Sequence, residues 1–407
     1  MAVLWEAEGH TRYLAREGRA GNRAGGPDRS GRIEPEVYPN SALRPQAAPG
    51  AIFWRGSAAP VGNRVSARHV LQGEAMPSSR GPRTSPLPPR AFLVGEGMRG
   101  ELSRRQLRHP RFEAPHRGVR RLKDDARSAH LRERVARAAA DYLPLLRRER
   151  REAFSHTTAL HLYGAPIRTP VEVHVSIAAP HGPARGRNVL GHHHGARVRP
   201  RALRVAGAAT ALPCVPPATA LIQSASLLSF REQVVAIDHL VRVRGRAGGE
   251  WSLAELHDLA AAVADSSARG ILRLRAALSV ARIGAESRME SLQHFELARM
   301  GVDTLELQAD LHDREGVWIG RFDSVDRVKR RILEYDGEQH RIDRAQYLHD
   351  ERRLDRARDE GYRVMRTHYE DFRPEALERT RAGLCEFLQC RPRPIPAWLE
   401  RYFAEPY

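Results

Sequence analysis

The sequence is poor in cysteine and in long apolar runs, and each shortage excludes a class of protein. Its three cysteines, Cys214, Cys385 and Cys390, form no disulfide framework and lack the paired spacing of a zinc finger. No apolar run reaches the roughly eighteen residues that cross a bilayer, and the N-terminus lacks an apolar core of signal-peptide length. We therefore expect a soluble cytoplasmic protein.

Acidic residues are scarce only in the upstream part of the chain. The formal net charge is +18. From residue 281 onward, 23 Lys and Arg stand against 26 Asp and Glu, so 44 of the 67 basic residues and 23 of the 49 acidic ones lie upstream. A basic front part holds a polyanion by releasing its counterions, and a mildly acidic back part suits a cation site. This distribution indicates nucleic acid as the partner.

Residues 1 to 92 are dense in Pro, Gly, Arg and Ser and show no helical or strand period. Such a segment buries too little apolar area to offset the entropy of ordering it. We expect it to be disordered, or to come from a start codon chosen too far upstream. The remaining chain is long enough for two or three domains.

Residues 93 to 280 are expected to be mostly helical and to begin like a winged helix. Ser103 can cap a short helix over 102–107, and Gly118 marks a turn into a basic strand. Alternating valines predict one further strand over 171–177. Apolar spacing and capping residues predict four more helices, over 127–149, 155–164, 219–242 and 252–280, the last interrupted near Gly270.

Residues 284 to 390 have the most regular pattern, and 391 to 407 are assigned as a tail. The pattern predicts the element order αβββαβα, which is typical of a three-layer α/β domain. Helices are expected over 286–300, from Asp343 to Gly361, and from Pro374, and strands over 305–311, 317–325, 330–336 and 362–367.

Acidic residues fall on two neighbouring strands of this block. If these strands form a hairpin that turns over 326–329, Asp323 lies opposite Glu334. Asp336 is two residues beyond Glu334 and shares its face. Three converging carboxylates repel one another unless a cation joins them. Such a cluster suits Mg²⁺ or Mn²⁺, which oxygen ligands hold.

Further side chains near this cluster suit phosphodiester hydrolysis, in which a metal polarises the phosphate and activates a water. Glu290 on the preceding helix can supply another carboxylate, and Glu286 is equally placed. His340, three residues past Gly337, can orient or deprotonate the water or protonate the leaving oxygen. Arg353 can bind the scissile phosphate while Asp350, one helical turn earlier, holds it.

Together these segments resemble the very-short-patch-repair-type (Vsr-like) family of the PD-(D/E)XK nuclease superfamily, in a branch of unknown function. The resemblance implies a restriction-endonuclease-like fold, with Asp323 and Glu334 as metal ligands supported by Glu290, Asp336 and His340. The matching segments are Ala285 to Ser291, Arg321 to Asp323, Glu334 to Gly337 with His340, Asp343 to Gln346 with Asp350 and Arg353, and Gly361 to Val364.

The chain departs from the superfamily pattern in two places. Asp336 occupies the position of the usual lysine, so proton transfer falls to His340 or to water. The apolar stretch that often follows the first aspartate is replaced by Ser324, Val325 and Asp326.

The region before the nuclease-like block resembles type IV antitoxin-like proteins of the AbiEi kind, which actinobacterial members of this branch often carry. The resemblance rests on the winged-helix-like start over 102–119 and on a second segment over 156–164. It implies DNA binding or regulation in phage defence.

Two other features carry no prediction of a metal site. The run His192, His193 and His194 could bind a metal, but it lies between glycines in a basic, hairpin-like stretch, and a zinc site is not favoured there. Cys385 and Cys390, five residues apart on the expected last helix, are interpreted as partly buried small apolar residues.

Two hypotheses follow for the function. The first is a metal-dependent endonuclease acting on DNA in repair or phage defence. RNA stays open as its substrate, because no motif that reads a 2′-hydroxyl is visible and DNA is favoured by family analogy. The alternative is a DNA-binding, antitoxin-like transcriptional regulator whose nuclease fold is inactive.

Overall fold

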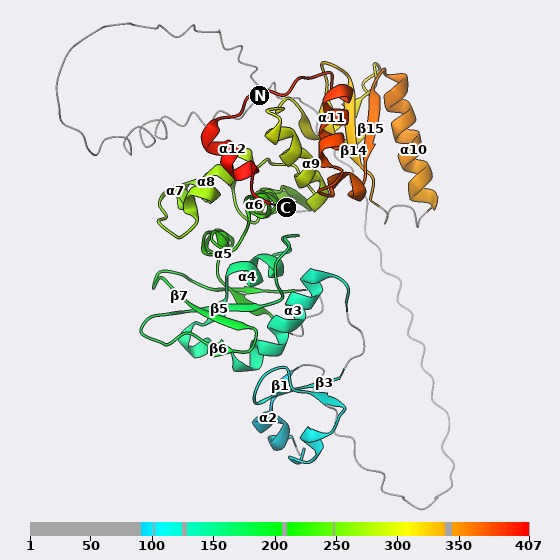
Figure 1. Cartoon of the computed structure of the whole chain (residues 1–407). Helices are drawn as coiled ribbons and strands as arrows, with labels where there is room; N and C mark the ends of the chain where they lie inside the picture. The colour runs from blue at the N-terminus through cyan, green and yellow to red at the C-terminus, as the bar shows by residue number, and fades with distance from the viewer. Residues whose placement is uncertain are drawn as a thin grey trace, which may run out of the picture. The chain divides into compact units, whose positions relative to one another are not determined.

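The chain is an α/β protein with several sheets (Figure 1). The computed structural model describes residues 91–100, 102–123, 128–205, 210–246, 249–337 and 344–406. The segment 1–90, the helix cap predicted at Asp343 and the predicted site residue His340 lie outside the described residues. None of the helices in the described part is long and apolar enough to cross a membrane.

Residues 91–123 form a small three-stranded unit. The strands β1 (Phe92–Leu93), β3 (Val119–Leu122) and β2 (Phe112–Glu113) lie in that order, with α2 (Val94–Arg99) and the 3-10 turn η1 (Gln106–Arg108) beside them. Phe92, Leu107 and Phe112 form its core. Phe92, which we had placed in the disordered segment, is therefore an ordered core residue.

The turn and strand predicted at Gly118 are confirmed, but the helix predicted over 102–107 is wrong. Gly118 has φ +82°, in the left-handed region. The Ser103 Oγ accepts from the Gln106 backbone N–H at 3.2 Å, as in a cap, yet only a single 3-10 turn follows. Pro110 restricts the backbone before it and prevents the turn from continuing as a helix.

Residues 128–214 contain a six-stranded sheet, so the expectation of a mostly helical region is wrong for this stretch. The strand order is β6 (Arg185–Gly186), β7 (Val189–His194), β5 (Val173–Ala178), β4 (Ala153–Phe154), β9 (Leu212–Cys214) and β8 (Arg201–Leu203). The strand expected over 171–177 is β5. The strands β4, β6, β8 and β9 have only two or three residues and are too short to show an alternating pattern, and the six residues of β7 do not alternate between apolar and polar.

The helices of this region are shorter than expected. α3 (Leu131–Tyr142) and α4 (His156–Leu162) pack against β5. The single helix expected over 219–242 is two helices, α5 (Pro217–Ser224) and α6 (Phe230–Val241), because Ser229 caps the second. A small hairpin of β10 (Arg244–Arg246) and β11 (Gly249–Trp251) follows.

The predicted interruption near Gly270 is confirmed between α7 (Leu256–Ala264) and α8 (Ile271–Val280). Gly270 has φ +85°, and a Cβ atom there would lie 2.5 Å from the carbonyl oxygen of Ala225. Only glycine fits this close approach.

The element order αβββαβα predicted for the C-terminal block is confirmed. It runs α9 (Arg288–Arg299), β12 (Glu306–His312), β13 (Trp318–Asp326), β14 (Arg331–Tyr335), α10 (Arg344–Asp359), β15 (Arg363–Thr367) and α11 (Leu377–Phe387). The sheet order is β12, β13, β14, β15, and only the pair of β14 and β15 is parallel.

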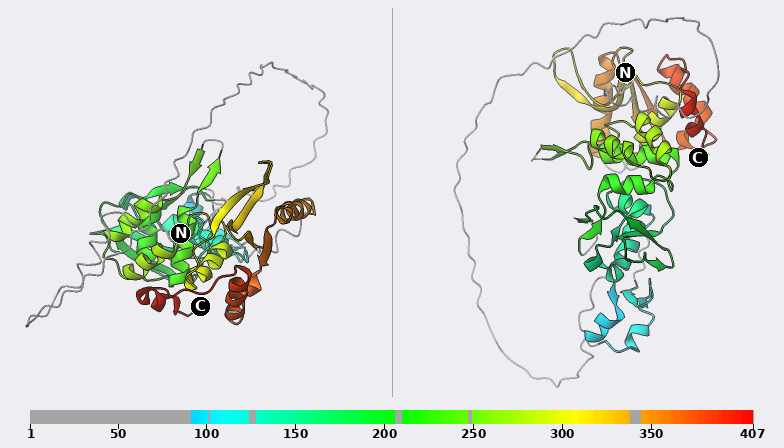
Figure 2. Two further views of the ribbon diagram at one scale, coloured as in Figure 1. Left: turned by 90° about the horizontal axis from the view of Figure 1, so that it is seen from above. Right: turned by 90° about the vertical axis from the view of Figure 1, so that its left-hand side faces the viewer.

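Helices cover both faces of this sheet, which gives three layers (Figures 1 and 2). Leu354 of α10 packs on one face with Phe322 and Ile332. On the other face, Leu297 of α9 and Leu384 of α11 pack with Leu333. Cys385 and Cys390 lie at the edge of this second core, which confirms them as partly buried small residues. Cys390 follows α11 instead of lying on it.

The segment assigned as a tail contains a further helix, α12 (Ala397–Phe403), which packs on α6 and α8. The Phe403 ring centroid lies 5.1 Å from that of Phe230, edge to face. This segment is therefore part of the core around α6.

A buried ion pair and a buried hydrogen bond join α6 to α9. Glu232 accepts hydrogen bonds of 2.5 and 2.7 Å from the Arg288 guanidinium, and Asp238 Oδ2 lies 2.5 Å from His294 Nε2. Asp238 Oδ1 also accepts from the Arg282 backbone N–H at 2.9 Å. Because these contacts cross between the helical region and the C-terminal block, they fix the position of α9.

We predict that Asp238→Ala lowers the free energy of unfolding by about 3–5 kcal/mol, because Asp238 is fully buried and its loss leaves His294 and the Arg282 N–H without their partner. Chemical denaturation measures this. The exposed Asp265→Ala is the control and should stay within about 0.5 kcal/mol of wild type. A loss no larger than that of the control would show that the contact of Asp238 with His294 does not hold the two helices.

A second prediction concerns acid sensitivity. Burial lowers the pKa of His161 and of His239 to about 4 each. The folded state keeps both rings neutral, whereas the unfolded chain takes up protons below about pH 6.5. Their contribution to stability is therefore complete above pH 6.5 and is lost as the pH falls toward 4, at up to about 1.4 kcal/mol per pH unit for each ring.

The variant carrying His161→Gln and His239→Gln should lose stability less steeply than wild type between pH 6.5 and 5 in urea titrations. The exposed His257→Gln is the control and should follow the wild-type curve. Parallel curves for the double variant and wild type would contradict the prediction.

Candidate active site

The hairpin of β13 and β14 brings Asp323 and Glu334 together, as the sequence predicts. The register pairs Ser324 with Leu333, so the next pair along the strands is Asp323 with Glu334. The Asp323 backbone N–H donates to Glu334 Oε1 at 3.1 Å, and the Tyr335 N–H donates to Asp323 Oδ2 at 2.9 Å. The two carboxylates therefore share one patch of the sheet.

Glu290 reaches this pair through a residue that the sequence analysis missed. Gln308 on β12 donates from Nε2 to Glu290 Oε2 at 3.0 Å and to Asp323 Oδ1 at 3.2 Å. The register pairs Leu307 with Ser324 and leaves Gln308 across from Asp323. The position opposite a predicted ligand on the next strand is the signal that could have found it.

Of the two glutamates left open by the sequence, Glu290 faces the cluster. It is in the first turn of α9, where its backbone N–H donates to the capping Ser287 Oγ at 3.2 Å. Its carboxylate also accepts from the Glu286 N–H at 2.7 Å. The Glu286 side chain points elsewhere and pairs with Arg242 at 2.7 Å.

Burial makes the charged forms of these carboxylates costly. It is the largest cause that raises the pKa of Glu290 and of Glu334 to about 7, and the charge of Asp323 adds to both shifts. Burial also raises the pKa of Asp323. Arg353 acts in the opposite direction on Glu334. Such a cluster can exchange protons near neutral pH or take up a cation.

Arg353 lies at the site. Its guanidinium donates to Glu334 Oε2 at 2.9 Å and to the Arg321 carbonyl oxygen, and stacks 4.5 Å from the centroid of the Phe322 ring. The Glu334 carboxylate thus attracts Arg353 toward the sheet, and its support by Asp350 stays a prediction. A Cβ at Gly320 would lie 2.4 Å from Arg353 Cδ, so Gly320 makes the room for this side chain.

Asp336 follows the end of β14. Its backbone N–H donates to the Thr367 carbonyl at 2.9 Å, and its carboxylate lies 3.8 Å from the Arg366 guanidinium. The structure thus gathers Glu290, Asp323, Glu334 and Arg353, and adds Gln308 to them. His340 cannot be placed, since it lies outside the described residues.

The donor set fits a hard cation. Mg²⁺ and Mn²⁺ need one or two carboxylates and complete their shell with water and phosphate oxygens, which Asp323 and Glu334 allow. Gln308 lies between Glu290 and Asp323, and Arg353 pairs with Glu334. Among the described residues, the group of potential ligands whose atoms all lie within 4.8 Å of one another consists of histidines elsewhere in the chain.

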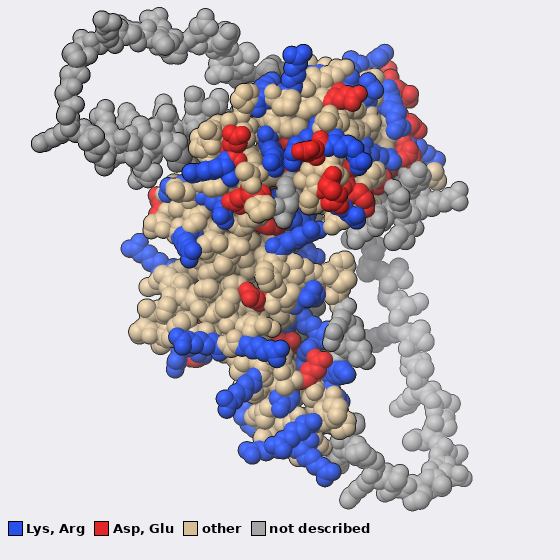
Figure 3. Space-filling view, in the orientation of Figure 1, with Lys and Arg blue, Asp and Glu red and all other residues tan. Residues whose placement is uncertain are grey.

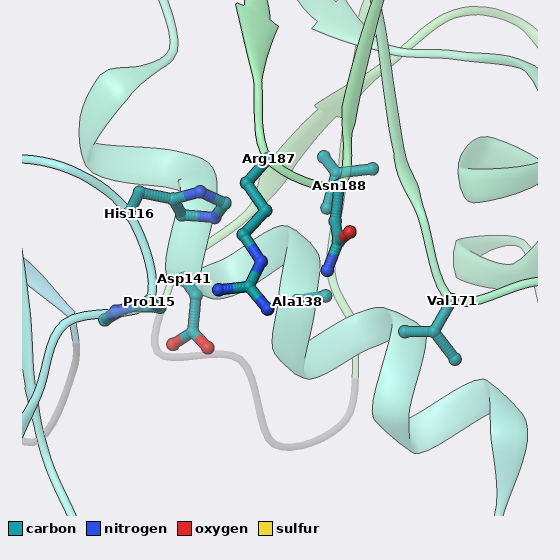
Figure 4. Close-up of a pocket in the computed structure, with 8 residues that line it drawn as sticks. Pro115, His116, Ala138, Asp141, Val171, Arg187 and Asn188 are labelled. Atoms are coloured by element: carbon teal, nitrogen blue, oxygen red, sulfur yellow. The ribbon is translucent and has the colours of Figure 1, made fainter.

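A cavity of about 250 Å³ lies apart from this cluster, between the small N-terminal unit and the six-stranded sheet. The side chains of His116, Asp141 and Arg187 face the same space (Figure 4). Burial raises the pKa of Asp141 to about 6, and Arg121 Nε lies 3.2 Å from its carboxylate. These residues come from three segments of the chain, which is why no sequence motif marks the cavity.

We predict that Asp323→Asn raises the free energy of unfolding by about 1 kcal/mol in buffer with a chelator, because it removes a buried charge that two carboxylates repel. Asp310→Asn is the matched control on β12. Hydrogen bonds from Arg321 and Trp318 lower the pKa of Asp310, so its neutralisation should not stabilise the protein. Urea titration compares the two variants, and a destabilised Asp323→Asn would show that the carboxylates do not strain the fold.

Compared with known proteins, the chain matches no family model, no curated protein and no solved structure. The site is therefore defined by its own contacts. These are two carboxylates on adjacent strands, a third on α9, a glutamine that bridges Glu290 and Asp323, and an arginine that pairs with Glu334.

Proposed function

We propose that the protein is a divalent-metal-dependent endonuclease that hydrolyses phosphodiester bonds in DNA. The observation that carries this proposal is the partly buried cluster of Glu290, Asp323 and Glu334. Withdrawing three carboxylates from water lowers stability, and such groups are usual where a cation or a proton must be handled. Asp323 and Glu334 would hold Mg²⁺ or Mn²⁺.

The topology of the C-terminal block supports the same proposal. A mixed sheet with the order β12, β13, β14, β15 carries the acidic pair on its central hairpin, and helices lie on both faces. This arrangement agrees with the proposal that residues 284 to 390 form a restriction-endonuclease-like domain of the Vsr-like kind.

Each side chain has a role in the proposed reaction. When bound, the metal supplies Lewis acidity that polarises the phosphate and acidifies a water. Asp323 and Glu334 present oxygen ligands from adjacent strands. Glu290, whose pKa burial raises to about 7, can accept the proton of the attacking water or return one to the leaving oxygen. The Arg353 guanidinium pairs with Glu334, and its N–H groups suit a hydrogen bond to the phosphate of a bound nucleic acid.

The small N-terminal unit is proposed to bind the DNA backbone. Residues 91 to 123 contain 9 Lys and Arg against 3 Asp and Glu. In Figure 3, basic side chains gather over this unit, which is cyan in Figure 1. A basic hairpin beside a short helix suits contacts with phosphates, which supply affinity without reading the sequence.

One observation favours the alternative, a DNA-binding regulator with an inactive nuclease fold. The ion pair of Arg353 with Glu334, at 2.9 Å, places a guanidinium where a metal would need a free carboxylate oxygen. In that reading Arg353 replaces the cation, and the cluster needs no metal.

The test is nicking of supercoiled plasmid in Mg²⁺ or Mn²⁺ by wild type, Asp323→Asn and Glu334→Gln, with the exposed Asp310→Asn as the control. We expect wild type and Asp310→Asn to nick the plasmid and both site variants to lose at least about 100-fold in rate, because each removes a metal ligand. Single-stranded DNA and RNA substrates in the same assay identify the nucleic acid.

Equal inactivity of all four proteins, with equal binding to duplex DNA, would overturn the nuclease proposal and favour the regulator. Activity that both site variants retain would place the chemistry at another site. Cleavage of RNA alone would keep the reaction and change the substrate.

A further inference from the structure

Three histidines from separate segments meet on the six-stranded sheet. They are His156 at the first turn of α4, His174 in β5 and His192 in β7, and each offers one ring nitrogen within 4.8 Å of the others. His174 Nδ1 lies 3.0 Å from His192 Nε2, and the ring centroids of His156 and His192 are 3.8 Å apart. The cluster shares no residue with the carboxylate site.

The backbone builds this cluster through specific contacts. β5 and β7 are parallel neighbours, and the register pairs Ser176 with His192, so His174 lies two positions away on the same face. The Ser155 N–H donates to the His174 carbonyl at 2.9 Å, which holds the start of α4 against β5. Thr158 Oγ1 in turn accepts from the His174 N–H at 2.9 Å.

His156 has a backbone conformation that a side chain rarely adopts. Its φ is +50°, in the left-handed region. Such strain persists where the surrounding structure imposes it, most often at functional sites. The strain directs the His156 ring into the stack with His192.

We propose that His156, His174 and His192 bind one borderline divalent ion of the Zn²⁺ class. Neutral imidazole suits Zn²⁺ and not the hard Mg²⁺. Zn–N bonds of about 2.0–2.1 Å in a tetrahedron place the ligand nitrogens about 3.3 Å apart, close to the separation of His174 from His192. Three histidines leave a fourth position for water or an anion.

The surroundings of the rings suit this role. Burial lowers the pKa of His156 to about 2 and that of His174 to about 4, so their lone pairs are free of protons at neutral pH. Ser155 Oγ lies 2.9 Å from His156 Nδ1, and Glu172 Oε2 lies 3.7 Å from His174 Nε2. Oxygen partners of this kind orient metal-binding histidines through the nitrogen that faces away from the ion.

The neighbouring histidines provide a matched control. His193 is exposed and adjacent to His192 in β7, so its side chain points to the opposite face of the strand. If metal bound only to the run of three consecutive histidines, His193 would matter and His174 would not. The proposed site predicts the reverse.

The experiment uses the full chain, stripped with a chelator and titrated with Co²⁺ and then with competing Zn²⁺. Co²⁺ reports near-tetrahedral nitrogen ligation in the visible spectrum, and elemental analysis gives the Zn²⁺ content per chain. We expect wild type and His193→Ala to bind one ion per chain and His192→Ala to bind at least about 100-fold more weakly, since loss of a ligand exceeds loss of an outer partner. Circular dichroism verifies that His192→Ala is folded.

His174→Gln is the second ligand variant, and Zn²⁺ should raise the melting temperature of wild type but not of either ligand variant. Asp323→Asn should keep full Zn²⁺ uptake, which separates this site from the proposed catalytic one. The proposal is overturned if wild type takes up no Co²⁺ or Zn²⁺. It is equally overturned if His192→Ala and His174→Gln bind as wild type does, or if His193→Ala alone loses the metal.

Discussion

The buried contacts between α6 and α9 determine where the candidate site can form. Glu232 with Arg288 and Asp238 with His294 lie a turn and a half apart along both helices, so they fix the rotation of α9 as well as its position. Glu290 is on this helix, two residues from Arg288. A helix held only by apolar contacts can rotate by a few degrees about its axis. Such a rotation would break the hydrogen bond from Gln308 to Glu290. These contacts between α6 and α9 thus connect α6 to the cluster.

The cluster also depends on alignment across three strands. The registers place Gln308, Asp323 and Glu334 in one line on β12, β13 and β14, and α10 covers its end with Arg353. One guanidinium and one amide oppose three carboxylates, so the site favours further positive charge. The repulsion among the carboxylates lowers the stability of the C-terminal block, and it does so at the proposed active site. A side chain at position 320 would collide with Arg353, so Gly320 is needed to leave room for this arginine.

The sequence predicted the C-terminal block well because its strands are five to nine residues long and Ser287 caps its first helix. The position of Asp323 opposite Glu334 followed from the predicted hairpin alone. The sequence failed where the determining contact is not local. The short strands β4, β6, β8 and β9 form through pairing with other strands of the sheet, Arg353 is directed by a carboxylate 19 residues away in the chain, and His156 meets His192 across 36 positions of sequence. No periodicity encodes such encounters.

The two clusters differ in the ion that each could retain. Carboxylates on β13 and β14 are hard ligands that exchange with water, as a metal must when it meets a phosphate. The imidazoles near α4 are neutral, borderline ligands, and oxygen partners hold two of them in place. Mg²⁺, which suits the carboxylates, therefore competes poorly for the imidazoles. With Glu232 and Asp238 of α6 anchoring α9, and α6 itself following the six-stranded sheet in the chain, an ion at the histidines would stabilise the region on which the carboxylate site is supported.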